Sequence, residues 1–411
     1  MATSTQRQRL LDIVAAALLA VDGRQCVARA LHARAPINGD ICLAAIGKAA
    51  RAMTEGAIDV VGQQIRAGLV ITKPMDAALE LPEVVQLRLA DHPIPGRRSL
   101  DAGEALLAFV RSCSARDTLL FLISGGASSL VEVLPPHIDL DNLQKINRWL
   151  LGSGYNIRQI NALRQRISCI KAGRLANFIR SQRVVSLMMS DVEGNDQRII
   201  GSGLLTASPA VDMSSFHLPA WVLALIDDDP DRPSAEASVF DRIEQGIVAD
   251  LGQALRAAEA TAARLGYVVY NHGSVLYGEA GQRGMEIGKY LLEAPVGVHL
   301  WGGETTVTLP ATIGSGGRNL QFALAAAKTL AGESAIILAA LASDGDDGNS
   351  GVAGAIVDGA TLARACASID EVNDALLRAD AKGLLQRGRA LQSLAKGRSN
   401  VADIVIAIKG D

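Results

Sequence analysis

Four short segments of the sequence combine glycines with charged or hydroxyl side chains, a composition that suits phosphate or carboxylate chemistry. They are Ser124–Ser129 (SGGASS), Gly302–Thr306 (GGETT), Gly314–Asn319 (GSGGRN) and Ser343–Gly348 (SDGDDG). Glycine-rich turns present backbone N–H groups without bulky side chains, and such groups bind anions. These segments are therefore the first candidates for a functional site.

The turn at Gly125-Gly126 is flanked by Ser124 and Ser128 and follows an apolar run, so it stands where a strand turns into a possible helix. Its backbone could hold an anion. A Gly-Gly turn alone is equally consistent with a tight connection that has no ligand.

Arg318 follows the glycines of its segment, and this places a guanidinium beside flexible backbone. Such a combination can hold a phosphoryl group while its charge redistributes. An arginine after a glycine turn is more often a solvated surface residue, so the segment by itself does not decide the matter.

The acidic segment follows the apolar run 336–342 and contains Asp344, Asp346 and Asp347. Carboxylates gathered at a strand end are costly unless a cation or an alcohol proton is there to be bound. The alternative is an Asx-rich turn, because the spacing matches only part of a calcium loop and lacks its later glutamate.

Lys48 follows the apolar run 41–46 and opens a helical pattern, so its ammonium could neutralise a phosphate. The chain has neither G-x-x-x-x-G-K-[ST] nor G-x-G-x-x-G after its first strand, which leaves a P-loop or an ordinary dinucleotide fold unsupported. Of six histidines, His92 stands in the most distinctive context, between Asp91 and Pro93. Structural hydrogen bonding explains it at least as well as catalysis.

The elements that must position these residues alternate between strands and helices. Apolar runs predict strands at 41–46, 68–72, 118–123 and 184–189, with helices at 10–20, 100–113 and 140–151. The stretch 160–178 is expected to be helical throughout. This alternation predicts a parallel, doubly wound sheet with right-handed crossovers, and ligands bind such sheets where strands end in loops.

A segment with several aspartates and two prolines, 226–234, indicates a domain boundary. We therefore expect one domain at 1–233 and a second α/β domain at 234–411. The second domain is expected to have helices at 249–265, 278–292 and 320–330, strands at 267–271 and 335–342, and a strand pair at 298–309. The last strand, 401–408, could join either domain's sheet.

Composition excludes several classes of protein. The 411 residues are 49% hydrophobic and 20% charged, and 40 basic against 43 acidic residues leave a net charge of -3. We expect no nucleic-acid or membrane partner, because no broad basic field or long apolar run exists. The five cysteines form no C-x-x-C pair and no signal peptide is apparent, so a cytoplasmic location is expected.

These segments, taken in order, resemble the type II glycerate 2-kinase family, whose C-terminal part is the MOFRL domain. The resemblance spans nearly the whole chain, and its motifs are GKAA at 47–50, HPIP at 92–95, SGGAS at 124–128, NALR at 161–164 with Ser168 and Lys171, SDVEG at 190–194, GSG at 201–203, GEA at 278–280, GGETTV at 302–307, GGRN at 316–319, and SDG at 343–345 with Asp347-Gly348. No single motif is decisive, but their shared order is.

The resemblance implies transfer of the ATP γ-phosphoryl group to the 2-hydroxyl of D-glycerate, which gives 2-phosphoglycerate and ADP. It implies a larger Rossmann-like domain and a smaller α/β MOFRL-like domain, with the active site in the cleft between them. ATP and Mg²⁺ are the implied cofactors, and D-glycerate is the small-molecule partner. The resemblance leaves open whether the protein forms a homodimer.

Roles carry over to the matching positions. Lys48 and Arg318 become the main charge stabilisers, and Asp191 with Glu304 would help to hold magnesium. Asp344 or Asp347 would orient the attacking hydroxyl. The residues that would bind substrate or nucleotide are Ser124, Gly125, Gly126, Ser128, Gly303, Glu304, Gly317 and Asn319.

Some positions depart from the family pattern. Family members usually have His at Arg166, Gly at Ala172, Asp at Asn195 and Glu at Gln321, and a proline after the glycine at 203. The C-terminal motif T-G-P-T-G-T-N-V-x-D is reduced to RSNVAD at 398–403. A kinase for a related hydroxy or polyol acid is therefore an alternative, as are a hydroxypyruvate reductase and a ligand-binding homologue that has lost turnover.

Overall fold

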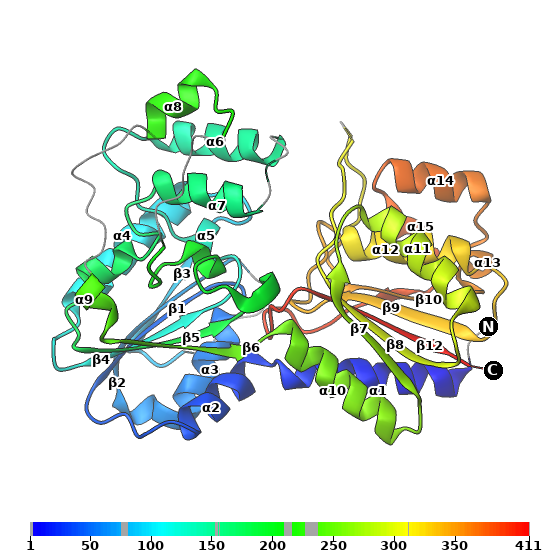
Figure 1. Cartoon of the computed structure of the whole chain (residues 1–411), viewed down its shortest axis with the longest axis horizontal. Coiled ribbons are helices and arrows are strands. Elements are labelled where there is room, and N and C mark those ends of the chain that lie inside the picture. Colours follow the sequence, from blue (N-terminus) through cyan, green and yellow to red (C-terminus); the bar gives the residue numbers. More distant parts are fainter. Residues whose placement is uncertain are drawn as a thin grey trace. The chain divides into compact units, whose positions relative to one another are not determined.

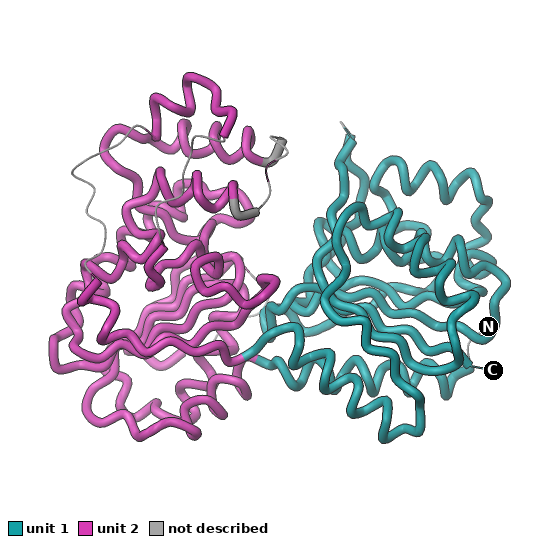
Figure 2. The backbone as a smooth tube through the Cα atoms, in the orientation of Figure 1, with its two compact units in different colours: residues 1–22, 249–411 teal, residues 23–248 magenta. Residues whose placement is uncertain are grey.

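The computed structural model describes residues 3–74, 81–152, 155, 157–208, 216–226, 237–310 and 312–410. The chain folds into two compact units, residues 23–248 and residues 1–22 with 249–411 (Figure 2). The expected boundary at 233/234 lies outside the described residues, and the units divide at Val248 and Ala249. The first 22 residues, which the sequence placed in the N-terminal domain, belong to the unit built from the C-terminal part.

The unit of residues 23–248 is built on a six-stranded sheet of order β3-β2-β1-β4-β5-β6. Its strands are β1 (Ile41–Ile46), β2 (Ile65–Thr72), β3 (Val85–Leu89), β4 (Thr118–Ile123), β5 (Arg183–Met189) and β6 (Ile243–Ala249). The pairs from β3 through β5 are parallel. The predicted doubly wound α/β architecture is thus confirmed, with the strand order reversing between β1 and β4.

The two central strands, β1 and β4, are apolar and buried along their whole length, as strands covered on both faces are. Helices α2 and α3 lie on one side of the sheet, and α4 and α7 lie on the other (Figure 1). The helices of this unit are α2 (Gly23–His32), α3 (Ala50–Val61), α4 (Arg97–Ser112), α5 (Ala127–Leu130), α6 (Leu140–Gly152), α7 (Ile157–Arg166), α8 (Ala220–Ile226) and α9 (Ala237–Phe240).

The predicted single helix at 160–178 is wrong. Helix α7 ends at Arg166, and a short 3-10 helix, η2 (Arg174–Phe178), follows after a loop. In the loop, Ala172 and Gly173 have φ angles of 56° and 81°, which no α-helix contains. Their backbone N–H groups donate to the carbonyls of Ser202 and Gly203 at 3.1 and 2.6 Å, so a tertiary contact replaces the helical bonds.

The other unit has a six-stranded sheet of order β11-β10-β9-β12-β8-β7. Its strands are β7 (Val269–Leu276), β8 (Gly297–Gly303), β9 (Ile336–Ala342), β10 (Gly354–Asp358), β11 (Leu391–Gln392) and β12 (Asp403–Lys409). The C-terminal strand β12 lies between β8 and β9 and is antiparallel to both. It therefore belongs to the second sheet, which resolves the alternative left open by the sequence.

Helices cover both faces of this second sheet, with α1 and α10 on one side and α11 and α12 on the other (Figure 1). The helices are α1 (Ser4–Ala20), α10 (Leu251–Arg264), α11 (Ala280–Glu293), α12 (Arg318–Thr329), α13 (Thr361–Ala365), α14 (Ile369–Leu377) and α15 (Ala381–Arg387). Helix α1 buries Leu10, Ile13, Val14 and Ala17 and contacts α10 and β12. That apolar stripe accounts for its place in this unit.

The strand pair expected at 298–309 is a single strand. β8 ends at Gly303, and beyond it Thr306 forms an isolated bridge with Glu279. The N–H of Thr308 donates to the Glu279 carboxylate at 3.0 Å, so a side chain takes the place of a neighbouring strand. Among the helices that the structure describes, none is long and apolar enough to cross a membrane.

Candidate functional site

Four of the candidate residues follow the carboxyl ends of parallel strands. Lys48 follows β1, His92 follows β3, Ser124 follows β4 and Asp191 follows β5. Carboxyl ends of parallel strands share one edge of the sheet, and the point where strand order reverses is where open α/β sheets bind ligands. Here that point lies between Lys48 and Ser124.

The backbones after β1 and β4 contact each other directly. Ser124 donates its N–H to the Ile46 carbonyl at 3.0 Å, and its buried Oγ accepts from the Ala49 N–H at 3.0 Å. Gly47 has φ of 132°, and a Cβ there would lie 2.1 Å from Ser124 Oγ. The contact therefore requires glycine at 47, and it gives Ser124 a structural task.

The glycine turn brings Lys48 and His92 together. Gly126 has φ of 85°, and a Cβ on it would lie 3.1 Å from Lys48 Cγ and 3.2 Å from His92 Nε2. The Lys48 N–H donates to the Gly125 carbonyl at 3.0 Å. The stem of the Lys48 side chain, the His92 imidazole and a bare backbone turn thus meet at the switch point of the sheet.

Ser128, just beyond this turn in α5, belongs to a chain of hydroxyl contacts. Its Oγ lies 2.7 Å from Ser202 Oγ, and Ser202 Oγ donates to Asn161 Oδ1 at 3.1 Å. Asn161 lies on α7, so the chain ties the turn after β4 to that helix. Asn161 and Ser202 were part of the family resemblance, but neither was predicted as a site residue.

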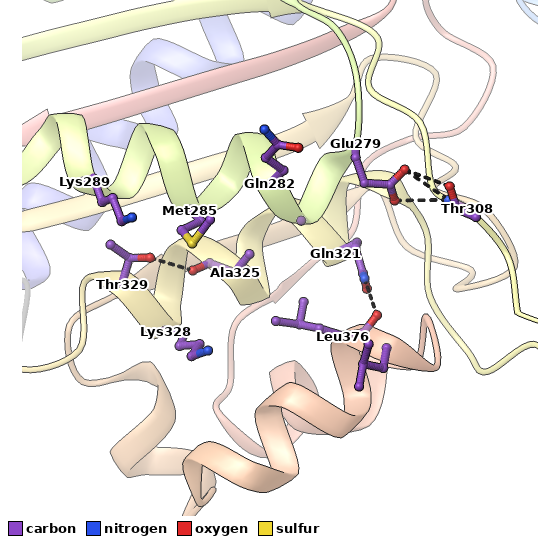
Figure 3. A pocket seen from close by; sticks show the side chains of 12 residues that line it. Glu279, Gln282, Met285, Lys289, Thr308, Gln321, Ala325, Lys328, Thr329 and Leu376 are labelled. Atoms are coloured by element: carbon purple, nitrogen blue, oxygen red, sulfur yellow. Dashed lines mark hydrogen bonds between the residues drawn. The ribbon is translucent and has the colours of Figure 1, made fainter.

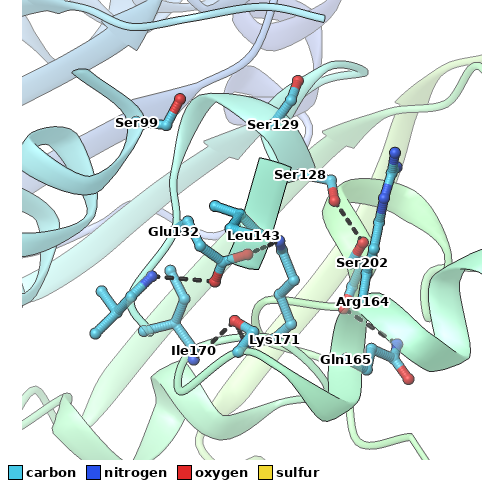
Figure 4. A network of polar contacts seen from close by, with 12 residues as sticks. Ser99, Ser128, Ser129, Glu132, Leu143, Arg164, Gln165, Ile170, Lys171 and Ser202 are labelled. Carbon is cyan, nitrogen blue, oxygen red and sulfur yellow. Dashed lines mark hydrogen bonds and ion pairs between the residues drawn. The ribbon is translucent and has the colours of Figure 1, made fainter. Parts of the chain in front are cut away.

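A buried ion pair between Lys171 and Glu132 lies in the same unit, and its side chains are each 1% exposed. Burial lowers the pKa of Lys171, and Glu132 works against that shift. No local signal in the sequence pairs these two residues, because they are 39 positions apart. Figure 4 shows them together with Arg164 and the serines.

The second group of candidates surrounds Arg318, the first residue of α12, in the other unit. Its guanidinium donates to Asp403 from Nε to Oδ2 at 2.5 Å and from Nη2 to Oδ1 at 3.0 Å. It also donates from Nη1 to Glu304 Oε1 at 2.5 Å. Gly303 lies opposite Asp403 in the pairing of β8 with β12, so the sheet positions both carboxylates.

The electrostatic interactions of this group favour the charged forms of Arg318 and Asp403. Burial acts to lower the pKa of Arg318, but Asp403 and Glu304 outweigh it and the net shift is upward. Burial raises the pKa of Asp403, which taken alone would favour a neutral carboxyl. The two short guanidinium contacts indicate the ionised form, because a carboxylate accepts both of them.

Asp347 is committed to the start of α12. Its Oδ1 accepts from the Asn319 N–H at 3.0 Å and its Oδ2 from the Leu320 N–H at 2.9 Å. A Cβ on Gly317 would lie 2.3 Å from the Asp347 Cγ, which explains the glycine. Burial raises the pKa of Asp347 to about 6. The N–H groups that might have bound a phosphate are thus partly taken by this side chain.

Asp344 is 6% exposed, and its Oδ1 accepts from the Asp346 N–H at 3.0 Å. Its carbonyl accepts from the Gly397 N–H at 3.0 Å, close to the C-terminal motif. These contacts fit the Asx-rich turn that was the alternative for this segment. Whether Asp344 or Asp347 orients a hydroxyl stays a prediction.

The proposed metal ligands, Asp191 and Glu304, lie in different units, and Glu304 is paired with Arg318. Within the described residues, no three His, Cys, Asp or Glu side chains gather as metal ligands would. The part of the chain that the structure describes therefore contains no protein-only cage for a cation.

A pocket of about 670 Å³ lies in the unit of Arg318, between α11, α12 and α14 (Figure 3). Gln321 lines it and donates from Nε2 to the Leu376 carbonyl at 2.6 Å. This contact needs a donor, which accounts for glutamine where the family usually has glutamate. Ala172, where the family usually has glycine, takes the left-handed φ that favours glycine.

Comparisons with known proteins cover most of the chain. A family model described as "Domain of unknown function (DUF4147)" matches residues 9–218, and one described as "MOFRL family" matches residues 297–403. D-glycerate 2-kinase of Thermotoga maritima is 30% identical over 90% of each chain. A putative hydroxypyruvate reductase of Agrobacterium vitis is 34% identical over 87% of this chain and 84% of the relative. The crystal structure of glycerate kinase from Thermotoga maritima superposes with a TM-score of 0.82 and 28% identity, covering 99% of this chain and all of that one.

Proposed function

Because this chain belongs to the glycerate 2-kinase family with a C-terminal MOFRL domain, we propose that it transfers the γ-phosphoryl group of ATP to the 2-hydroxyl of D-glycerate. The products are 2-phosphoglycerate and ADP. The 2-hydroxyl oxygen forms the new P–O bond, the bond between the γ-phosphorus and the β,γ-bridging oxygen breaks, and the hydroxyl proton passes to a carboxylate.

The observation that carries this proposal is the meeting of Lys48 with the Gly125-Gly126 turn at the switch point of the parallel sheet. Phosphoryl transfer demands positioning and charge neutralisation, which an ammonium beside bare backbone supplies. Lys48 neutralises phosphate charge, and the backbone of the turn, which Ser124 and Ser128 flank, cradles phosphate or the substrate carboxylate.

The unit that contains α12 contributes the second cation, Arg318, which stabilises the charge of the transferring phosphoryl group. Its contacts with Asp403 and Glu304 hold the guanidinium in one orientation, and preorganised donors are the most effective stabilisers of developing charge. Glu304, with Gly303, Gly317 and Asn319, surrounds this arginine. Asp344 or Asp347 accepts the hydroxyl proton, and the raised pKa of Asp347, about 6, suits a proton acceptor near neutral pH.

Magnesium is proposed to arrive with ATP. Mg²⁺ usually keeps several waters and binds through phosphates and one or two carboxylates, so a protein-only cage is not required. Asp191, which follows β5, is the proposed protein carboxylate. When bound, the ion neutralises charge on the phosphate oxygens.

The reductase named among the relatives is the second candidate. A dinucleotide-binding turn after the first strand needs the G-x-G-x-x-G pattern, because its glycines let the backbone approach the pyrophosphate. The turn after β1 reads GKAA instead, with a lysine where close approach is needed. This observation favours the kinase.

The test is a coupled assay of ADP release with D-glycerate, tartronate and erythronate, each with and without Mg²⁺. We expect ADP release that depends on both magnesium and acid and is fastest with D-glycerate. No ADP release with any of the acids would overturn the proposal. Oxidation of NADH by hydroxypyruvate in the same preparation would favour the reductase.

A further inference from the structure

Among the described residues, basic side chains gather around the buried Lys171–Glu132 pair. Arg164 on α7 and Arg174 at the start of η2 both act electrostatically on Lys171, as does Glu132. Glu132 is the carboxylate that acts on Arg164 within the described part of the chain. Among the described residues, Arg164 and Lys171 thus share the Glu132 carboxylate, and we refer to these three residues as the Arg164 cluster (Figure 4).

Both carboxylate oxygens of Glu132 already have partners close to the cluster. Its Oε2 pairs with the Lys171 ammonium, and its Oε1 accepts the Val133 N–H at 3.0 Å. Arg174 donates to the carbonyls of Ser168 and Gln165. Uncompensated buried charge is expensive, and an added anion would relieve it.

Arg164 has the free capacity to take that anion. Its Nε donates to Asn147 Oδ1 at 3.1 Å, and Asn147 is anchored by donating to the Leu143 carbonyl at 2.9 Å. Among the described residues, the two terminal nitrogens of Arg164 have no hydrogen-bond acceptor. Neither nitrogen is completely buried. Two adjacent terminal nitrogens with N–H groups to donate match the two oxygens of a carboxylate.

Helix α7 contains both Arg164 and Asn161, the last member of the hydroxyl chain of Ser128. Asn161 is three residues before Arg164 on α7, so the two side chains share a face of the helix. Ser202 gives its one hydrogen to Asn161 Oδ1, and therefore Ser128 donates to Ser202. The Ser128 oxygen keeps its lone pairs as acceptors. Figure 4 labels Arg164, Ser128 and Ser202 and marks the Ser128–Ser202 contact with a dashed line.

We propose that Arg164 binds the carboxylate of the hydroxy-acid substrate through its terminal nitrogens, while Ser128 Oγ accepts a hydrogen bond from a substrate hydroxyl. This inference rests on the proposed function and specifies its substrate site. It gives Arg164, which lies in the NALR motif at 161–164, a role in substrate binding. It also explains why the Ser128 hydroxyl, in α5, donates to Ser202 and leaves its lone pairs for a substrate hydroxyl.

The test is direct binding by calorimetry, without nucleotide, using D-glycerate and its neutral amide, D-glyceramide. In Arg164→Gln we expect D-glycerate to bind about 10- to 100-fold more weakly, the usual worth of hydrogen bonds to a charged group. The affinity for D-glyceramide, which lacks the charge, should fall less than about 3-fold in the same variant. Ser128→Ala should weaken both ligands alike, because both keep the hydroxyls. The KM for ATP in Arg164→Gln should stay at the wild-type value.

Two further variants complete the experiment. Arg148→Gln removes an exposed arginine from the neighbouring helix α6, whose contact is with Gln144, and should leave both affinities unchanged. Arg164→Lys keeps the positive charge but loses the pair of terminal guanidinium nitrogens, so it should recover part of the D-glycerate affinity. If Arg164→Gln does not fold, Arg164→Lys is the variant to compare with wild type.

The outcomes separate this site from the proposed function. If the wild-type protein binds D-glycerate through Arg164 but releases no ADP, the carboxylate site is supported and the proposed kinase activity is contradicted. Wild-type turnover with equal D-glycerate affinity in Arg164→Gln overturns the site alone. A wild-type protein that binds neither ligand and has no turnover overturns both.

Discussion

Arg318 and Asp403 form an ion pair with two contacts, from Nε to Oδ2 at 2.5 Å and from Nη2 to Oδ1 at 3.0 Å. Arg318 opens α12 and Asp403 opens β12, so the pair joins the N-terminus of a helix to a central strand of the sheet. The Asp403 side chain is 4% exposed and that of Arg318 is 29% exposed. The proposed catalytic arginine is thus held from within its own unit.

The first prediction concerns this pair. Asp403→Asn keeps the shape of the side chain but removes one of the two carboxylate charges that compensate Arg318. We expect the free energy of unfolding to fall by about 2 kcal/mol, because an arginine that is mostly buried loses the more buried of its two anions. The measurement is urea denaturation of both proteins under the same conditions.

An exposed ion pair in the same unit is the control. Arg378 and Asp374 pair on the surface of α14 with side chains 61% and 55% exposed. Arg378→Gln should cost less than about 0.5 kcal/mol, since surface pairs contribute little. Equal losses in Asp403→Asn and Arg378→Gln would contradict the account of the Arg318–Asp403 pair.

A second prediction follows from the upward pKa shift of Asp347, which burial raises from 3.8 to about 6. Between these two pKa values the folded protein binds more protons than the unfolded chain, so this group lowers the free energy of unfolding as pH rises from about 4 to about 6. Asp347→Asn removes the titration. The stability of wild type relative to this variant should therefore decline across that window and level off above it. A difference that does not change with pH would show that burial does not raise the pKa.

A third prediction concerns Gly47, where a Cβ would lie 2.1 Å from Ser124 Oγ and 2.6 Å from the Ser124 carbonyl oxygen. Gly47→Ala should lower the free energy of unfolding by about 3 kcal/mol or more, because the added Cβ clashes and because φ is 132°. Gly39→Ala is the matched control, because Gly39 also has a positive φ, 84°, but nothing within 4 Å of the added Cβ. It should cost only about 1 kcal/mol. Similar thermal stability in the two variants would exclude the tight packing of β1 against the turn after β4.

Much of the parallel sheet could be predicted because its strands are short apolar runs with a charged or glycine-rich end. The turns at Lys48 and Ser124 were found in this way, and the strand order then brings them together. The Arg318–Asp403 and Lys171–Glu132 pairs could not be predicted, because their partners are 85 and 39 positions apart and no local pattern couples them.

The wrong element assignments share a cause. In 160–178 and 298–309 the residue pattern suited a regular element, but side-chain or tertiary contacts took the backbone hydrogen bonds. The Glu279 carboxylate, for example, accepts the Thr308 N–H. Periodicity reports which face is apolar and contains no information on such contacts.

A fourth prediction tests the two cations. Lys48→Ala and Arg318→Ala should each lower kcat for D-glycerate phosphorylation at least about 100-fold, because each removes a preorganised stabiliser of phosphoryl charge. Lys48→Ala should leave the thermal transition near that of wild type, since Lys48 is a half-buried residue at the end of a strand. Near-normal rates in either variant would remove that residue from the proposed mechanism.

The most direct test of the central claim is the proton-coupled ³¹P NMR spectrum of the product formed from D-glycerate, ATP and Mg²⁺. A phosphate on the 2-hydroxyl has a single proton on the adjoining carbon, so its signal should be a doublet that grows as ADP forms. A triplet would mean transfer to the 3-hydroxyl, and the absence of a new phosphate ester would mean that D-glycerate is not the substrate.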